Sequence, residues 1–377
     1  MEEISREESV KLKGVAMCVI VLHNFVHLIS GVKENEMAFD EERLKLFFYA
    51  IAEQPSGLAT WLLSFLGAYG VQIFILLSGY GLAKKFIAIN MAGGYKRVSF
   101  PALLKVYFLI FPMFVFHATL ELIYNLLSDV GWQEIAIQLL NSLSFLMMAY
   151  NFSYETLFGS PMSILSTGPW WFIFLIAQLY LFAPILFVIL KRLGIRWWLG
   201  IIVAYLLIYA CLPLTESHDI PLFANAIGHF PEFVLGMGLA LYPNRLGWRH
   251  GLLCVIIFGL SIMNKWTFPL SFLSAGVVSL LAGRYVCAFL SKYHRGDRVL
   301  LFLGGISMFM FVLNAQIRNI TLQIYEGAHP NVMLLGACVH LMIVILVAAM
   351  YGRIHMKKFQ KWLDILVERV RGFPKVE

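Results

Sequence analysis

Long apolar segments follow one another along almost the whole chain of 377 residues, and they restrict its fold more than any other feature. Hydrophobic residues make up 60% of the sequence, charged residues only 14%, and the mean hydropathy is +0.77. A membrane-spanning helix needs about 20 predominantly apolar residues. We therefore predict an all-α, polytopic membrane protein, and the composition excludes a soluble globular domain. About ten transmembrane helices are predicted, at residues 10–31, 60–83, 101–124, 168–190, 197–214, 221–242, 249–264, 267–283, 299–322 and 331–352.

Basic residues gather in alternate loops and predict the orientation of the chain. Lys and Arg cluster after the predicted spans that end near residues 83, 190, 242, 283 and 352, whereas residues 126–167 contain none. Cytoplasmic loops carry the excess of these residues, so we expect both termini in the cytoplasm. Residues 1–355 then form the transmembrane domain and residues 356–377 a cytoplasmic amphipathic tail. The apolar residues 135–150 are too few to span the bilayer and predict an interfacial or re-entrant helix.

The cysteines and the net charge suggest neither a metal site nor a nucleic-acid partner. All five cysteines lie inside or beside apolar segments, and no Cys or His spacing typical of metal ligands is visible. We interpret the cysteines as small buried hydrophobic residues and expect no metal. The net charge of +7 comes mostly from short basic loops, which in a membrane protein determine topology and contact anionic headgroups.

Two histidines lie inside the first predicted span. His23 follows Lys13 by ten residues, which is roughly 15 Å along a helix and about half the hydrocarbon thickness. An ionisable side chain at that depth is expensive, and this predicts a function for it. His27 lies one turn later on the same helix face. An imidazole titrates near neutral pH and can accept a proton from a hydroxyl, so both are candidate general bases, with His23 preferred.

Several motifs combine small, aromatic and basic residues at set spacings. They read Lys13-Gly14-Val15-Ala16 before His23, Phe74-x-x-x-Ser78-Gly79-Tyr80 in the second span, Lys96-Arg97 before Pro101, Trp170-Trp171-Phe172 in the fourth span, Pro231-Glu232-Phe233 with Gly236 in the sixth, and Gly305-Ile306-Ser307 before Asn314 in the ninth. Together these motifs, which extend along most of the chain, resemble acyltransferase family 3.

The resemblance implies an integral membrane O-acyltransferase of the cytoplasmic (inner) membrane. Such an enzyme would move an acyl group, most simply acetyl, from cytoplasmic acyl-CoA to a hydroxyl of a lipid-linked or cell-surface glycan. The implied partners are thus the lipid bilayer, acyl-CoA and a glycan acceptor, with no nucleic acid. The matching positions imply catalytic roles for His23, His27 and Glu232, substrate contacts for Ser78, Tyr80, Trp171 and Asn314, and coenzyme phosphate contacts for Lys13, Lys84 and Arg97.

The chain departs from the family pattern at three places. In the family, ten positions lie between the basic residue and the histidine, which is a step of eleven residues. The same step from Lys13 reaches Asn24, one residue after His23 and three before His27, so either histidine could be the base. The acidic residue common in the fourth helix is missing, and Asn314 replaces a late histidine. Asparagine can orient a substrate but cannot carry a proton at neutral pH. A second hypothesis is therefore a secondary transporter or glycan exporter that keeps an acyltransferase-like scaffold without catalysis.

Overall fold

The computed structural model describes residues 3–90, 95–104, 171–218, 220–242 and 246–371, with scattered positions between 106 and 136. Every element in these residues is helical, which confirms the predicted all-α class. The elements are α1 (Arg6–Ile29), α2 (Glu41–Glu53), η1 (Pro55–Gly57), α3 (Leu58–Leu66), η2 (Gly67–Gly70), α4 (Val71–Ala88), η3 (Tyr95–Ser99), α7 (Trp171–Leu193), η5 (Gly194–Arg196), α8 (Leu199–Ser217), η6 (Leu222–Ala224), η7 (Ala226–His229), α9 (Phe230–Leu241), α10 (Trp248–Ser261), α11 (Pro269–Ser291), α12 (His294–Thr321), η8 (Leu322–Ile324) and α13 (Pro330–Arg371).

Seven helical segments in the described residues are long and apolar enough to cross a membrane. They are Arg6–Ile29, Pro55–Ala88, Trp171–Arg196, Leu199–Ser217, Pro269–Ser291, His294–Ile324 and Pro330–Arg353, and each coincides with a predicted span. The spans predicted at 221–242 and 249–264 appear as the shorter apolar helices Ala226–Leu241 and Trp248–Ser261. Most of the span predicted at 101–124, and the interfacial helix predicted at 135–150, lie outside the described residues.

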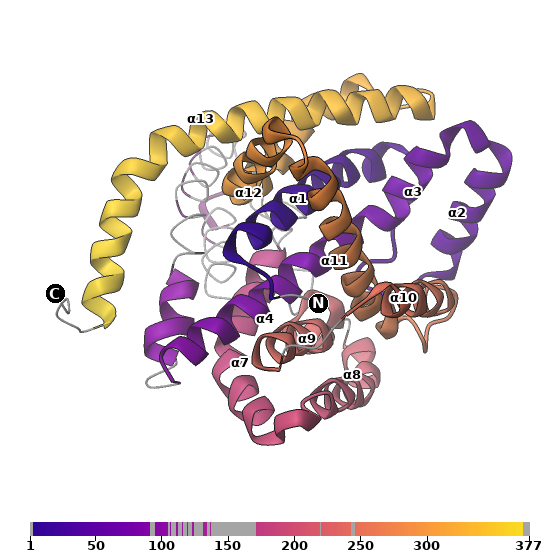
Figure 1. The fold of residues 1–377 in the computed structure, drawn as a ribbon. Coiled ribbons are helices and arrows are strands. Elements are labelled where there is room, and N and C mark those ends of the chain that lie inside the picture. Colours follow the sequence, from indigo (N-terminus) through magenta and orange to yellow (C-terminus); the bar gives the residue numbers. More distant parts are fainter. Residues whose placement is uncertain are drawn as a thin grey trace.

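Helix α1 lies in the middle of the bundle, between α12 and α13 on one side and α4 on the other (Figure 1). Its start is defined by Ser5, whose side chain accepts a hydrogen bond from the backbone N–H of Glu8. Its end is followed by Gly31 at a φ of 74°, a conformation that favours glycine and ends the helix with a sharp turn. The histidines of α1 are therefore surrounded by other helices.

Two crossings of helices are close because glycine provides no side chain. A Cβ at Gly79 of α4 would collide with the Phe233 carbonyl of α9, and one at Gly236 of α9 would collide with the Leu76 carbonyl of α4. Gly304 of α12 similarly lies against the Val10 carbonyl of α1. Small residues allow this approach between membrane helices, where packing has to replace the hydrophobic driving force. The glycine of the Ser78-Gly79-Tyr80 motif thus serves helix packing.

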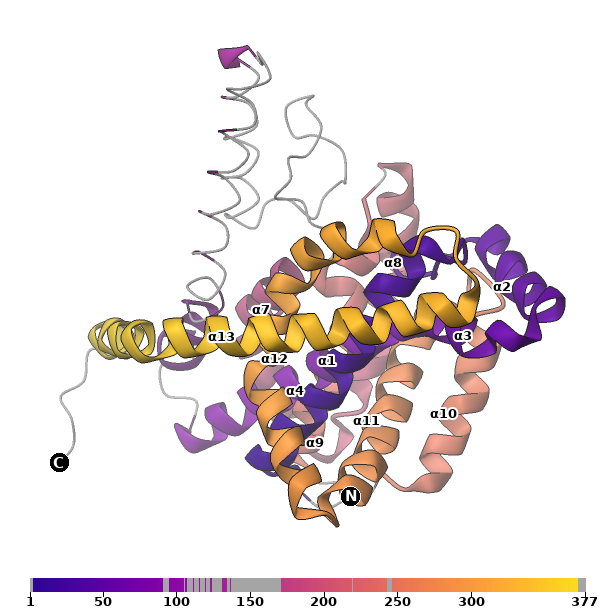
Figure 2. The ribbon, with the colours of Figure 1, turned by 90° about the horizontal axis from the view of Figure 1, so that it is seen from above.

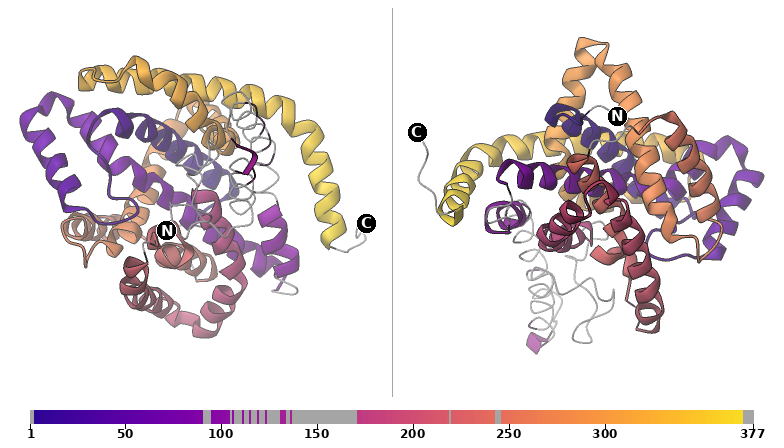
Figure 3. Two further views of the ribbon diagram at one scale, coloured as in Figure 1. Left: turned by 180° about the vertical axis from the view of Figure 1, so that it is seen from behind. Right: turned by 60° about the horizontal axis from the view of Figure 1, so that its bottom comes forward.

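Helix α13 is a single helix of 42 residues that continues past its apolar part. It crosses over α12 and α1, and its C-terminal end extends beyond them (Figure 2). That end and helix α2 lie at opposite edges of the molecule (Figure 3). The helix runs without a break from residue 355, the predicted end of the transmembrane domain, into the predicted tail that begins at residue 356.

Candidate active site

His23 is held inside the bundle by the second membrane segment. Its side chain is buried, and its Nδ1 lies 3.0 Å from the backbone oxygen of Leu63 in α3. A carbonyl oxygen only accepts hydrogen bonds, so Nδ1 carries a hydrogen. In the neutral form of His23, Nε2 is therefore the basic nitrogen with the lone pair.

The second membrane segment is interrupted beside His23. Between α3 and α4 the chain forms the 3₁₀ turn η2, Gly67–Gly70. A Cβ at Gly67 would lie 2.5 Å from the Cβ of His23, and one at Gly70 would lie 3.2 Å from the Cγ1 of Ile20. These two glycines let α1 approach the interrupted segment closely enough for the Leu63 hydrogen bond. Gly67 and Gly70 lie three residues apart in the sequence, a pattern of small residues that indicates the close approach of another helix.

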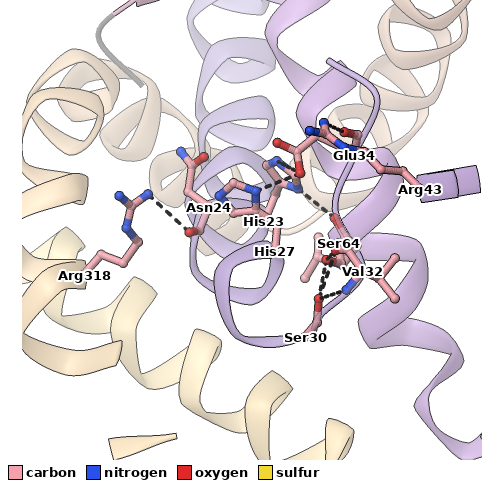
Figure 4. A network of polar contacts seen from close by, with 10 residues as sticks. His23, Asn24, His27, Ser30, Val32, Glu34, Arg43, Ser64 and Arg318 are labelled. Atoms are coloured by element: carbon pink, nitrogen blue, oxygen red, sulfur yellow. Dashed lines mark hydrogen bonds and ion pairs between the residues drawn. The ribbon is translucent and has the colours of Figure 1, made fainter. Parts of the chain in front are cut away.

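A carboxylate missing from the sequence-based site completes the cluster. Glu34, in the loop after α1, is buried, and its Oε2 lies 2.7 Å from Nδ1 of His27 and 4.0 Å from Nε2 of His23. The rings of His23 and His27 are 4.7 Å apart (Figure 4). Nδ1 of His27 donates to the carboxylate, which leaves Nε2 of His27 as a second basic nitrogen.

The loop is folded back onto the histidines by its own polar contacts. Ser64 of α3 donates to the Val32 carbonyl at 2.5 Å, and Ser30 and Ser64 share a hydrogen bond of 2.7 Å. Arg43 of α2 donates to the backbone oxygen of Glu34 at 2.8 Å. Because these contacts fix the backbone on both sides of Glu34, its side chain is directed to the histidines (Figure 4).

The charge of Glu34 depends on its histidine neighbours. Burial alone would raise the pKa of this carboxyl group. The hydrogen bond from His27, together with the positive charges that His23 and His27 carry when they are protonated, outweighs burial and lowers the pKa to about 2. Glu34 is therefore ionised at any physiological pH.

The cluster lines a cavity of about 350 Å³, which we call the histidine cavity. Its polar lining residues are His23, Asn24, His27, Glu34, Glu36, Arg43 and Arg318, and its apolar ones include Ile20, Met37, Trp171, Phe172 and Phe311. Of the residues predicted for the site, His23, His27 and Trp171 thus meet in one place. The cavity is large enough for a small acyl group and part of an acceptor.

Asn314 has a partner outside the histidine cavity. Its Oδ1 lies 2.8 Å from Nε2 of His340 in α13, and Nδ1 of His340 lies 3.1 Å from the hydroxyl of Thr321. The ring of Phe25 stacks on His340 with a centroid distance of 5.0 Å. These buried contacts tie α12 to α13, whereas a substrate contact was predicted for Asn314.

Glu232 is paired with the histidine three residues before it. The Nδ1 of His229 lies 3.5 Å from its carboxylate, and Nε2 of His229 donates to the Phe223 carbonyl at 2.7 Å. Trp171 stacks on His229 and lines the histidine cavity, so it separates this pair from His23. Glu232 itself is fully buried and is not among the residues that line the cavity.

The serine and tyrosine of the second-span motif contact other parts of the protein. The side chain of Ser78 interacts with the hydroxyl of Tyr180 in α7. The hydroxyl of Tyr80 accepts from the backbone N–H of Ile4 at 3.1 Å, and Lys84 lies over the ring of Tyr80 at 5.6 Å. These contacts fix α4 to α7 and to the N-terminal segment. Neither residue lines the histidine cavity.

The predicted phosphate-binding cations differ in their surroundings. Lys84 forms an ion pair of 2.6 Å with Glu3. Lys13 is half-buried in α1, near Lys85, and has no acidic partner among the described residues. Arg97 lies in η3, which packs against α4 and α7. Of the two lysines, Lys13 is the one whose charge is left uncompensated.

These features define a class of protein and agree with one known family. The described residues include seven helices long and apolar enough to span a membrane, and a cluster of two imidazoles and a carboxylate, which can accept and donate protons, lies among them. The chain belongs to acyltransferase family 3, because the family model described as an acyltransferase domain matches residues 12–352. The protein is therefore a membrane acyltransferase, as the motifs predicted. No curated protein and no solved structure matches the chain.

The contact between Gly67 and His23 gives a first prediction. Gly67→Ala places a methyl group against the Cβ of His23 and displaces the imidazole. A shift of about 1 Å at a catalytic group costs on the order of 10²-fold in rate, so we expect a loss of that size in acyl transfer. Gly81→Ala is the control, because nothing lies within 4 Å of a Cβ there. Equal activities of the two variants would show that His23 does not need this position.

Proposed function

We propose that the protein transfers an acyl group, most simply acetyl, from cytoplasmic acyl-CoA to a hydroxyl of a lipid-linked or cell-surface glycan. The observation that carries the proposal is the basic Nε2 of His23, held beside the Glu34 carboxylate in a cavity within the membrane-spanning helices. We place the protein in the cytoplasmic membrane with both termini inside. The donor then reaches the cavity from one face and the acceptor from the other.

His23 acts as the general base in this reaction. Its Nε2 takes the proton of the acceptor hydroxyl while the hydroxyl oxygen attacks the thioester carbonyl. The imidazolium that forms is stabilised by the Leu63 carbonyl on Nδ1 and by Glu34, whose carboxylate lies 4.0 Å from Nε2. Collapse of the tetrahedral intermediate expels the coenzyme thiolate, which recovers the proton from Nε2. His27 shares the Glu34 carboxylate and is the second candidate for the base.

The coenzyme phosphates bind at the cytoplasmic ends of the first helices. Lys13 supports this assignment, because it is a half-buried cation with no acidic partner among the described residues. Burying an unpaired charge is unfavourable, and an anionic ligand beside it removes that cost. Arg97 lies in η3, which packs against α4 and α7, and a guanidinium can bind a phosphate through two parallel hydrogen bonds.

The experiment that tests the function uses purified protein and acetyl-CoA. Release of the free coenzyme thiol, with transfer of the acetyl group to an added glycan or to water, is the expected result. Coenzyme binding without any release of thiol would instead favour a transporter that retains the scaffold.

A second prediction concerns the donor. Arg97→Ala removes a charge-assisted contact worth roughly 1.5–3 kcal/mol, or about one to two decades in affinity. The phosphates are remote from the reacting carbonyl and bind alike in the ground and transition states, so KM for acyl-CoA rises while kcat is kept. Lys13→Gln has the same sign and a smaller effect. Lys191→Ala, at an exposed lysine of α7, is the control. Unchanged coenzyme affinity in both variants would remove these cations from the donor site.

A further inference from the structure

Arg318 of α12 is a buried cation inside a membrane-spanning segment. Its relative exposure is 8%, and the segment His294–Ile324 that contains it is apolar. A guanidinium is always charged and is costly to place in the membrane interior. Such a residue needs either a partner or a functional interaction that offsets the free energy of burying its charge.

The described part of the chain does not neutralise this guanidinium. Its Nη1 donates a long hydrogen bond of 3.4 Å to the backbone oxygen of Asn24, and its buried Nε has no hydrogen-bond partner. No ion pair joins it to a carboxylate of the described residues, and Glu34 is engaged by His27. Arg318 therefore has hydrogen-bond donors left for a negatively charged oxygen.

These donors belong to the histidine cavity. Arg318 lines it together with His23 and His27. In Figure 4 its side chain reaches from α12 toward Asn24, on the side of the two histidines away from Glu34. The cavity thus has a carboxylate on one side of its bases and an unpaired guanidinium on the other.

We propose that Arg318 is a catalytic residue that stabilises the oxyanion of the tetrahedral intermediate, an inference that rests on the proposed acyl-CoA-dependent function. As the acceptor oxygen bonds to the thioester carbon, the π-electron pair of the carbonyl moves to its oxygen, which becomes negative. The hydroxyl proton goes to Nε2 of His23. When the intermediate collapses, the electron pair re-forms the carbonyl, the carbon–sulfur bond breaks, and the thiolate takes the proton from Nε2.

The two charges created in this step meet opposite charges already in place. The imidazolium forms beside Glu34, and the oxyanion forms beside Arg318. Donors positioned before the reaction at the site where charge develops lower the barrier, because they need no reorganisation during the step. The burial of an unpaired arginine is then explained by the charge it meets in the transition state.

The alternative occupant is an anionic group fixed to the acceptor, such as a carboxylate. Hydrolysis of acetyl-CoA by water separates the two, because it forms the same oxyanion and uses no glycan. We expect Arg318→Gln to lower the kcat of this hydrolysis by about 10²–10³-fold, with coenzyme affinity unchanged. Arg318→Lys, which keeps the charge but loses the fork of donors, restores part of the rate. Arg298→Gln, at an exposed arginine of the same helix, is the matched control.

The outcomes are distinct. Wild-type rates of hydrolysis in Arg318→Gln, together with a raised KM for the glycan, would overturn the oxyanion role and assign Arg318 to the acceptor. Wild-type rates in both reactions would overturn any role in the cavity. If the wild-type protein itself neither hydrolyses nor transfers the acyl group, the proposed function falls, and the role of Arg318 falls with it. Loss of folding in Arg318→Gln would show as aggregation in gel filtration, and the Arg318→Lys rates then decide between the roles.

Discussion

His23→Asn is expected to lower kcat for acyl transfer by about 10²–10⁴-fold, the usual contribution of a general base. The asparagine amide can still donate to the Leu63 carbonyl, so the local packing and the position of α1 are kept. The change removes the basic Nε2 and little else. Coenzyme affinity and thermal stability should therefore stay near the wild-type values. Rates of thiol release from acetyl-CoA and titration of coenzyme A into the purified protein measure the two effects separately.

The matched variant is His27→Asn, one turn away on the same helix. We expect it to lose less activity, because His27 Nδ1 is engaged by Glu34 and its loss leaves the His23 Nε2 in place. The opposite ranking would transfer the role of base to His27. Chelation provides a further control, since His23, His27 and Glu34 place their ligand atoms within 4.8 Å of one another and could hold a metal ion. If activity were lost with a chelator and restored by zinc, the reaction would depend on a bound metal ion and not on a histidine acting as general base.

The sequence predicted the helical spans well and the neighbours of individual residues poorly. The seven long spans follow from apolar length alone, because the backbone in lipid must satisfy its own hydrogen bonds as helix. The pair His23 and His27 follows from helical periodicity on one element. In contrast, Glu34 lies in the loop after α1, and the contact between Ser30 and Ser64 helps to fold this loop back against the helices. The periodicity of a helix cannot predict how such a loop folds.

The same distinction explains the residues that do not reach the cavity. Asn314 and Glu232 are both buried in apolar helices, but the residues that face them from other elements decide what each side chain contacts. For Asn314 that partner is His340, which lies on another helix 26 positions along the chain. From the sequence alone, Gly79 could equally contact a ligand or allow two helices to pack closely. The Phe233 carbonyl lies against Gly79 in the structure, so this glycine serves helix packing.

Glu34→Gln is expected to lower kcat by roughly 10-fold to 100-fold, because a hydrogen bond to a charged group and the ion pair with the imidazolium together contribute about 1.5–3 kcal/mol. Glutamine keeps the size of the side chain and loses its charge. The base works when unprotonated, so the rate falls on the acid side where the imidazole gains its proton. Without the carboxylate the imidazolium is less stable, and this acid limb of the pH–rate profile moves to lower pH. An acid limb that does not move would show that Glu34 does not stabilise the protonated base.

The stability of the folded protein provides a second test of Glu34→Gln. The pKa of Glu34 is about 2 in the folded protein, against an ordinary value of 4.5, and a lowered pKa means that the ionised form stabilises the fold. This contribution is complete above the ordinary value of 4.5 and is lost as the pH falls from there toward 2. Thermal unfolding in detergent should therefore show wild-type stability decreasing as the pH falls below about 4.5, with a smaller decrease in Glu34→Gln. Glu42→Gln, the same change at an exposed residue of α2, should follow the wild type. If Glu34→Gln also followed the wild type, the carboxylate would not be the group that the histidines hold ionised.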